Sequence, residues 1–304
     1  MMAITVPQER LLTSRTTLRR NNAAEYLFLV PAVLFVGFTV LYPLAYNVVQ
    51  SFQDVGIAQI VSGQAKYVGL DNYADQFGRP EFWESFGISL VYTGGTVLVT
   101  FVAGLALALF FHRDFPGRNV LRALLLLAWV LPTVVSANVW RWLLDGTYGL
   151  LNTVLGTEIF WLGAPSTAMI AVVLASAWSF APFAMILLLA GLQGISGSLY
   201  EAARIDGAGA WAQFRRITLP LLKPVSLTTV LLCFISTFKT FDTVFLMTQG
   251  GPGGATEVLP VYAYKLAFSF YKFDVAAVAT TMLLVVPVVL SVFYFRSLRK
   301  EELA

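Results

Sequence analysis

Six long apolar stretches, separated by short polar segments, dominate the pattern of this chain. Each stretch exceeds 20 residues with few charges, and about 20 apolar residues are enough for a helix to cross the hydrocarbon core of a bilayer. The pattern therefore predicts six transmembrane helices, at residues 26–49, 88–111, 121–143, 168–192, 225–247 and 275–295. A shorter run at 258–270 contains Pro260 and Lys265, and it predicts an interfacial helix on the outer side.

The composition also indicates a membrane protein rather than a soluble one. Hydrophobic residues make up 58% of the chain and charged residues 12%, whereas soluble domains carry about 25% charge. Mean hydropathy is +0.74. The single His112 and the single Cys233 exclude an internal disulfide and the usual zinc site. The basic residues form no stripe, so we expect contact with membrane lipid and none with nucleic acid.

The positions of lysine and arginine predict which side of the membrane each loop faces. Of the 20 basic residues, thirteen fall in the N-terminal tail (1–25), in the loops after the second and fourth predicted helices, and in the C-terminal tail (296–304); the other three loops hold four. Cytoplasmic loops carry the excess of basic residues. We therefore expect a transmembrane domain at 26–295 in the cell membrane, with both tails and the loop 193–224 cytoplasmic.

The loop 193–224 is too patterned to be a flexible linker. Residues 200–205 predict a short helix with Ser198 as its N-cap, and Gly207 and Gly209 end it. A second helical piece carries apolar side chains at spacing three, at Trp211, Phe214 and Ile217. Such a ridge either lies on lipid or inserts into a groove on a cytoplasmic protein, and periodicity alone leaves both open.

This loop resembles the EAA motif of binding-protein-dependent ABC importer permeases. The motif reads Glu-Ala-Ala, three residues, Gly, nine residues, Ile-x-Leu-Pro, and the spacing here fits without a gap. The residues concerned are Glu201, Ala202, Ala203, Asp206, Gly207, Ile217, Leu219 and Pro220. The resemblance implies that these residues form a coupling helix, which sits in a cleft on an ATPase subunit and transmits nucleotide-driven closure to the spans.

Further segments resemble the carbohydrate-uptake branch of that family. They lie at 67–73, 131–132, 140–142, 149–152, 241–242 and 248–252. The chain is similar to the compact first permease subunit of the lactose, trehalose and glycerol-phosphate systems. The resemblance implies an all-α, six-helix type I ABC importer permease bundle that takes up a sugar, with glycerol 3-phosphate or another polar solute as the alternative.

The resemblance also implies partners and a division of labour. These are a second permease subunit in a heterodimer, two ATPase subunits and an extracytoplasmic solute-binding protein. No Gly-x-x-x-x-Gly-Lys-[Ser/Thr] motif occurs in the chain, so no P-loop is present to bind ATP. We expect a non-catalytic subunit without a cofactor of its own, and ATP and Mg on the partner ATPase.

Polar side chains within the predicted helices are candidates for the solute path, because charges inside a bilayer are costly and face the protein interior. Lys239 and Asp242 lie three residues apart in the fifth predicted helix, hence on one face, where they either pair structurally or line the path. Side chains able to bind or stack on a sugar complete the set, at Asn138, Trp178 and Thr237. An ion-coupled secondary transporter would use several midplane acidic groups and internal repeats; only Asp242 is evident, so this class is less favoured.

Overall fold

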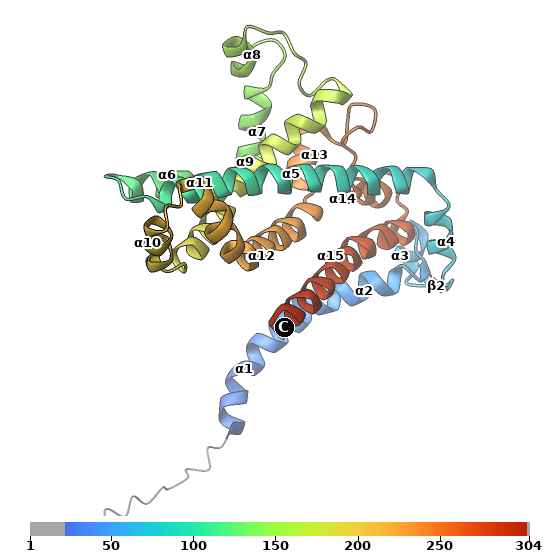
Figure 1. Cartoon of the computed structure of the whole chain (residues 1–304). Coiled ribbons are helices and arrows are strands. Elements are labelled where there is room, and N and C mark those ends of the chain that lie inside the picture. The colour runs from blue at the N-terminus through green and yellow to red at the C-terminus, as the bar shows by residue number, and fades with distance from the viewer. Residues whose placement is uncertain (1–21, 303–304) are drawn as a thin grey trace, which may run out of the picture. The chain divides into compact units, whose positions relative to one another are not determined.

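The computed structural model of the chain describes residues 22–302, in two units divided between Tyr46 and Asn47 (Figure 1). Most of the predicted N-terminal tail, 1–25, lies outside the described residues, and so do its four arginines. Within the described part, all regular elements are helices except two strands of two residues each. The predicted all-α class is therefore confirmed for residues 22–302.

Five helical segments of the described part are long and apolar enough to cross a membrane, and a bent pair of helices raises this number to six. The five segments are Leu27–Gln50, Pro80–His112, Pro165–Gln193, Ala210–Phe238 and Phe273–Arg296. Four of the six predicted spans thus reappear near their expected positions, and the third and fifth differ. The last helix, α15 (Phe273–Glu302), continues into the predicted tail 296–304.

The first of these segments is one continuous helix with a widened turn in the middle. It consists of α1 (Asn22–Val36), the π-helical turn η1 (Gly37–Leu41) and α2 (Tyr42–Gln50). Pro43 is the second residue of α2, just after the widened turn, and it has no N–H to donate to the carbonyl four residues earlier. The Tyr42 N–H instead donates to the Gly37 carbonyl, five residues back, so the helix absorbs the proline without breaking.

The second unit is built around α5 (Pro80–His112) and α9 (Pro165–Gln193), which pack along each other. The two backbones come closest at Gly104, where an added Cβ would lie 2.6 Å from the Ala184 Cβ and 3.1 Å from the Met185 backbone nitrogen. A glycine is needed at this crossing because any side chain would separate the helices. α12 (Leu219–Phe238) packs on both helices. Its Leu222 belongs to the buried apolar cluster that also contains Met185 and Leu188 of α9.

The third predicted span, 121–143, is not one helix. α6 (Arg118–Val130) and α7 (Thr133–Leu143) meet at an angle of 96°. The break lies at Leu131, whose backbone is extended (φ −58°, ψ 137°) because the following Pro132 disfavours helical conformation in the residue before it. The prediction of one continuous helix was therefore wrong, since hydropathy does not register this local steric effect.

The fifth predicted span, 225–247, is also displaced. The helix starts earlier, with α11 (Ala210–Gln213) and the π-helical turn η2 (Phe214–Thr218), and it ends at Phe238. Residues 242–247 belong to a separate helix, α13 (Asp242–Thr248). The widened turn η2 precedes Pro220 as η1 precedes Pro43, and the helix continues through this proline into α12.

The predicted interfacial helix at 258–270 is packed inside the second unit. α14 (Leu259–Tyr264) and η3 (Lys265–Ser269) follow each other, and all six residues of α14 except Tyr264 are buried, among α5 and α15. Pro260 lies in the first turn, where its missing N–H costs nothing. A helix within 258–270 is therefore confirmed, and its packing inside the unit was not expected from the pattern.

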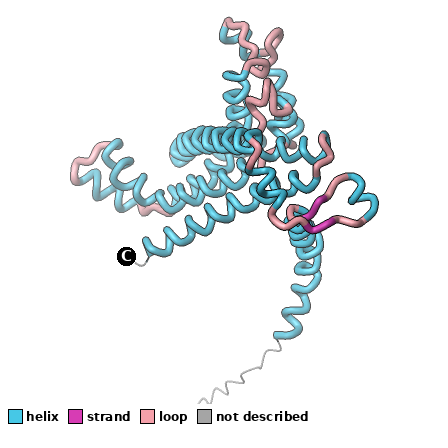
Figure 2. Tube along the Cα trace, turned by 90° about the vertical axis from the view of Figure 1, so that its right-hand side faces the viewer, coloured by secondary structure: helices cyan, strands magenta, loops and turns pink. Residues whose placement is uncertain are grey.

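A small segment joins the first helix to α5. β1 (Gln53–Asp54) and β2 (Lys66–Tyr67) pair antiparallel, with Gln53 opposite Tyr67, and enclose α3 (Ile57–Ser62) (Figure 2). α4 (Asp71–Phe77) follows, and its Asn72 side chain donates to the Ser51 and Gln53 carbonyls at 3.1 and 2.8 Å. These bonds hold α4 against the start of β1.

α7, α8 (Leu150–Leu155) and the loops around α8 form an arm (Figure 1). Asp145 stabilises the turn after α7. Asp145 Oδ1 accepts from the Thr147 and Tyr148 backbone N–H groups at 2.8 and 3.1 Å. These two bonds lower the pKa of Asp145 below its ordinary value of 3.8. The carboxylate is therefore ionised throughout the physiological range, and the turn keeps its acceptor.

Replacing Asp145 with alanine is expected to raise the exchange rates of the Thr147 and Tyr148 amides about tenfold, the usual effect of one lost hydrogen bond to a charged group. Asp145→Asn keeps an oxygen acceptor and should raise them less. Because the folded pKa is lowered, protection in the parent protein should be constant from neutral pH down to about pH 5 and be lost only as pH falls through that lowered pKa. Hydrogen–deuterium exchange measures both effects. Equal losses in the two variants would contradict this role of the side chain.

Candidate functional site

The loop 193–224 forms a compact helix–turn–helix. α10 (Gly197–Ile205) starts after Ser196, so the expected N-cap Ser198 lies inside the first turn, where its hydroxyl meets that of Ser196 at 2.8 Å. The helix ends at a left-handed Gly207 with φ +80°. The Gly207 N–H donates to the Arg204 carbonyl at 3.1 Å and the Ala208 N–H to the Ala203 carbonyl at 2.8 Å, the hydrogen-bond pattern of a Schellman turn.

Two side-chain bonds tie this turn to the helix that follows. The Gln213 side chain donates to the Ala208 carbonyl at 2.7 Å, and the Tyr200 hydroxyl lies 3.0 Å from that of Thr218. The second bond joins α10 to η2, which continues directly into α12. A side-chain hydrogen bond therefore links α10 to the helix that continues into α12.

Three large apolar side chains of this loop are exposed. Ile205 is 87% exposed, Trp211 72% and Leu199 45%. Of the predicted ridge, only Trp211 is exposed; Phe214 and Ile217 are half-buried, and the Trp211 and Phe214 rings lie 5.6 Å apart. Large exposed apolar side chains on an ordered helix indicate an interaction surface.

The residues of the sequence motif fall in α10, in the turn that follows it, in η2 and at the start of α12. The exposed ones are Glu201, Ala202, Asp206, Gly207, Leu219 and Pro220, and the half-buried ones are Ala203 and Ile217. In the part of the chain that the structure describes, the Glu201 carboxylate makes no hydrogen bond or ion pair. It is therefore available to an external partner.

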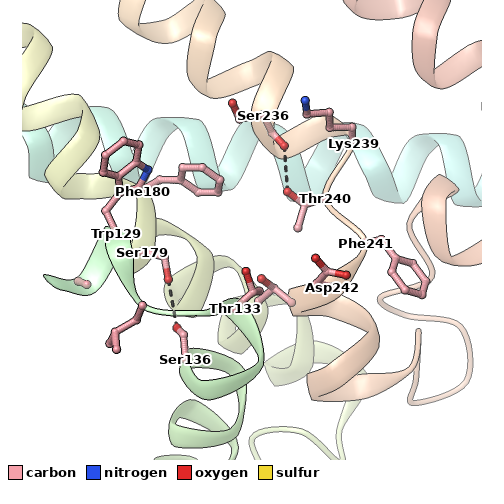
Figure 3. A pocket seen from close by; sticks show the side chains of 13 residues that line it. Trp129, Thr133, Ser136, Ser179, Phe180, Ser236, Lys239, Thr240, Phe241 and Asp242 are labelled. Carbon is pink, nitrogen blue, oxygen red and sulfur yellow. Dashed lines mark hydrogen bonds between the residues drawn. The ribbon is translucent and has the colours of Figure 1, made fainter. Parts of the chain in front are cut away.

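A second candidate site is a polar cavity of about 400 Å³ inside the helical bundle (Figure 3). It lies where two helices are interrupted, between α6 and α7 on one side and between α12 and α13 on the other, with α9 as a further wall. Hydroxyl groups line it, from Thr133, Ser136, Ser179, Ser236, Thr240 and Thr243, and so do aromatic rings, from Trp129, Phe180 and Phe241.

The hydroxyl groups of this cavity are only partly used by the protein. The Ser136 and Ser179 hydroxyls lie 3.2 Å apart, and the Thr240 hydroxyl donates to the Ser236 carbonyl at 3.0 Å (Figure 3). Each hydroxyl retains further donor or acceptor capacity. The cavity can therefore hydrogen-bond a polar solute while its aromatic rings contact apolar faces of that solute.

Lys239 and Asp242 both line the cavity, but not as a pair on one helical face. Lys239 is the residue after the end of α12, and Asp242 is the first residue of α13. Neither enters any ion pair found within residues 22–302. The expected shared face was wrong because the helix ends at Phe238, and both charges are left free at the cavity wall.

The three other predicted path residues lie outside this cavity. Thr237 is 1% exposed and packed inside, without a partner for its hydroxyl. The Trp178 ring packs against Trp140, with centroids 6.1 Å apart. Asn138 donates to the Val134 carbonyl at 2.8 Å and borders a different cavity, at the far end of α7.

Sequence reasoning missed most of the cavity lining because the lining depends on two helix breaks. The signals that could have found it are Pro132, which starts α7 beside Thr133 and Ser136, and the spacing of Ser236 and Thr240 by four residues. The residues that the structure describes contain no group of three or more His, Cys, Asp or Glu side chains that could hold a metal ion.

The chain matches the family described as binding-protein-dependent transport system inner membrane component, over residues 68–300. It is 36% identical over 266 residues to the trehalose/maltose transport system permease protein of Thermococcus litoralis, covering 86% of this chain and 87% of that protein. It is 32% identical over 297 residues to the diacetylchitobiose uptake system permease protein of Streptomyces coelicolor, covering 95% and 90%.

A third relative is the sulfoquinovosyl glycerol transport system permease protein of Agrobacterium fabrum, with 33% identity over 280 residues. The fold is similar to a chain of a bacterial ABC transporter that imports the polysaccharide alginate, with a TM-score of 0.78, 22% identity, and coverage of 92% of this chain and 96% of that one. The chain therefore belongs to the binding-protein-dependent transport system inner membrane component family, and it is a multi-pass permease subunit of an ABC importer.

Proposed function

We propose that this permease carries a sugar, and that the cavity between the interrupted helices is part of its path. The observation that carries this proposal is a cavity lined by six hydroxyl-bearing side chains together with Trp129, Phe180 and Phe241. Sugars have hydroxyl edges and C–H faces, and this lining offers partners for both. Two relatives that are named for trehalose/maltose and diacetylchitobiose support the same solute class.

The loop around Gly207 docks onto the ATPase in this proposal. The exposed apolar surface at Ile205 and Trp211 fits a helix-in-groove contact, and the free carboxylate of Glu201 sits beside it. The hydrogen bond from Tyr200 to Thr218 then passes the movement of α10 to α12. This role places the loop and both termini in the cytoplasm, in agreement with the excess of basic residues there.

The remaining partners follow from the same proposal. Two ATPase subunits bind ATP and Mg, a second permease subunit completes the path as a heterodimer, and an extracytoplasmic binding protein delivers the solute. This chain binds no nucleotide. Uptake that persists without the ATPase, driven by a proton or sodium gradient, would contradict the proposal in favour of a secondary transporter.

A glycerol phosphate is the second candidate solute, and the unpaired Lys239 at the cavity wall favours it. An anionic solute would pair with this ammonium group, whereas a neutral sugar would use it as one hydrogen-bond donor among several. The free Asp242 in the same wall opposes an anion. The two solutes therefore predict opposite responses to removal of the two charges.

The complete transporter, reconstituted with its binding protein, is to be assayed for ATP-dependent uptake of trehalose, maltose, diacetylchitobiose and glycerol 3-phosphate. We expect uptake of a sugar. Asp242→Asn should lower it about tenfold through loss of a charged hydrogen-bond acceptor, and Lys239→Met should lower it less. If only glycerol 3-phosphate is taken up and Lys239→Met abolishes this uptake, the solute is the phosphate. Val154→Ala, on α8 away from the cavity, is the control.

A further inference from the structure

A second cavity, of about 340 Å³, lies at the opposite end of α7 from the path cavity. It is enclosed by the last turns of α7, the turn that follows, and the segment 160–163. Most of its side-chain walls are aromatic or planar and polar, contributed by Asn138, Arg141, Trp142, Asp145, Tyr148, Phe160 and Trp161, and Leu144 and Leu162 complete them. Trp142, Tyr148 and Phe160 are all exposed, so their rings are accessible to a ligand.

The arm that carries these rings is held in place by the protein. Asn152, 6% exposed, donates to the Gly146 and Ile159 carbonyls at 3.2 and 3.0 Å and accepts from the Trp161 indole at 2.9 Å. Gly146 lies so close to Phe160 that an added Cβ would approach the ring to 2.8 Å. Because the rings are already positioned, a ligand would bind without a large cost of ordering them.

The polar groups of this cavity have capacity that the protein does not use. Among the described residues, Arg141 makes no hydrogen bond and no ion pair, although Asp145 is four residues away. Asp145 uses only Oδ1 for its turn, which leaves Oδ2 free. Asn138 donates through its amide nitrogen and leaves its oxygen free. The guanidinium donors of Arg141, one carboxylate oxygen of Asp145 and the amide oxygen of Asn138 thus line the same cavity as the aromatic rings.

This combination selects a class of ligand. A simple anion such as phosphate would be attracted by Arg141 and repelled by the ionised Asp145. An apolar ligand would leave three polar side chains without partners, at a cost in free energy. A sugar ring satisfies both kinds of wall, because its hydroxyl edge binds planar polar groups and its C–H face stacks on an aromatic ring.

We propose that this cavity is a second saccharide site, which holds one sugar ring outside the path cavity before the solute enters it. The inference rests on the proposed sugar function and adds a site to it. Ser136 borders the path cavity and Arg141 borders this one, and five residues of α-helix span about 8 Å. The two sites are therefore close enough for a solute to pass from one to the other along α7.

The test measures sugar binding to the complete transporter in detergent, without its binding protein. Trehalose, maltose and diacetylchitobiose are added separately, and saturation transfer from protein to sugar is recorded by NMR. We expect a signal with at least one of them, reduced about fivefold or more in Trp142→Ala and in Tyr148→Ala, as loss of an aromatic contact predicts. Trp142→Phe should restore most of it. Val154→Ala, on the same arm and 73% exposed but outside the cavity lining, should leave it unchanged.

Binding and uptake together separate this inference from the proposed function. If a sugar is taken up but gives no signal, or if the signal survives Trp142→Ala and Tyr148→Ala, the second site is rejected and the sugar function stands. If Val154→Ala lowers the signal as much as the ring variants do, the loss reflects a disturbed arm and the site is also rejected. If a sugar binds at this cavity and no sugar is taken up, the site stands and the proposed function is rejected.

Discussion

Replacing Gly207 with valine is expected to lower solute uptake at least tenfold while the protein still inserts into the membrane. Gly207 has φ +80°, and an added Cβ would meet nothing within 4 Å. The effect therefore comes from the backbone alone, since a left-handed conformation costs a residue with a side chain about 1–2 kcal/mol and β-branched residues more. With valine, the turn that closes α10 would open, and the exposed surface at Ile205 would lose its defined position.

The matched control for this prediction is Gly207→Asn, because asparagine tolerates left-handed conformations. Co-purification with the ATPase and ATP-dependent uptake are to be measured for both variants. The valine variant should lose both, and the asparagine variant should retain most of both. If valine leaves uptake intact, the turn is not needed for coupling. If asparagine abolishes uptake as well, a bulky group at this surface is excluded by contact rather than by backbone conformation.

Replacing Gly104 with valine is expected to have the largest effect on stability. The Gly104 position lies where α5 and α9 touch, 2.6 Å from the Ala184 Cβ and close to the backbone of Met185. Both neighbours are rigid, so the helices must separate, and overpacking of this kind costs about 1–3 kcal/mol or more. The variant should unfold at lower temperature in detergent and accumulate to a lower level in membranes.

Gly94→Val is the control for this second prediction. Gly94 belongs to the same helix, is exposed, and has nothing within 4 Å of an added Cβ. A thermal shift assay that compares the two variants separates close packing from the general effect of valine in a helix. Similar shifts in both would show that the contact with Ala184 is not limiting for stability.

Features set by residues close together in the sequence could be predicted, whereas features set by contacts between distant segments could not. Four spans and the position of the helix–turn–helix are set by local apolar runs and by glycines, and these were predicted. The break before Pro132 is a local effect too, but the apolar run through it hides the break from a hydropathy pattern. The closeness of Gly104 to Ala184 is set by the packing of two distant segments, and no local pattern encodes it.

The candidate path shows the same division. Lys239 and Asp242 were found because charges in apolar segments stand out, and the cavity contains both of them. Thr237 was expected there but lies inside the core, because its place on α12 turns it away from the cavity. The hydroxyl groups of Ser136 and Ser179 are common residue types, and only the bend between α6 and α7 brings them together.

The widened turn at 214–218 changes the rotation of the loop residues about the helix axis relative to the residues of α12. A π-helical turn contains one residue more than an α-helical turn, and one residue corresponds to about 100° of rotation about the helix axis. Trp211 therefore points in a direction that a regular helix running into α12 would not give it. Loss of a single residue from this turn would leave the side chains of the loop and of α12 unchanged. It would rotate the loop relative to α12, so that the loop side chains would contact different neighbours.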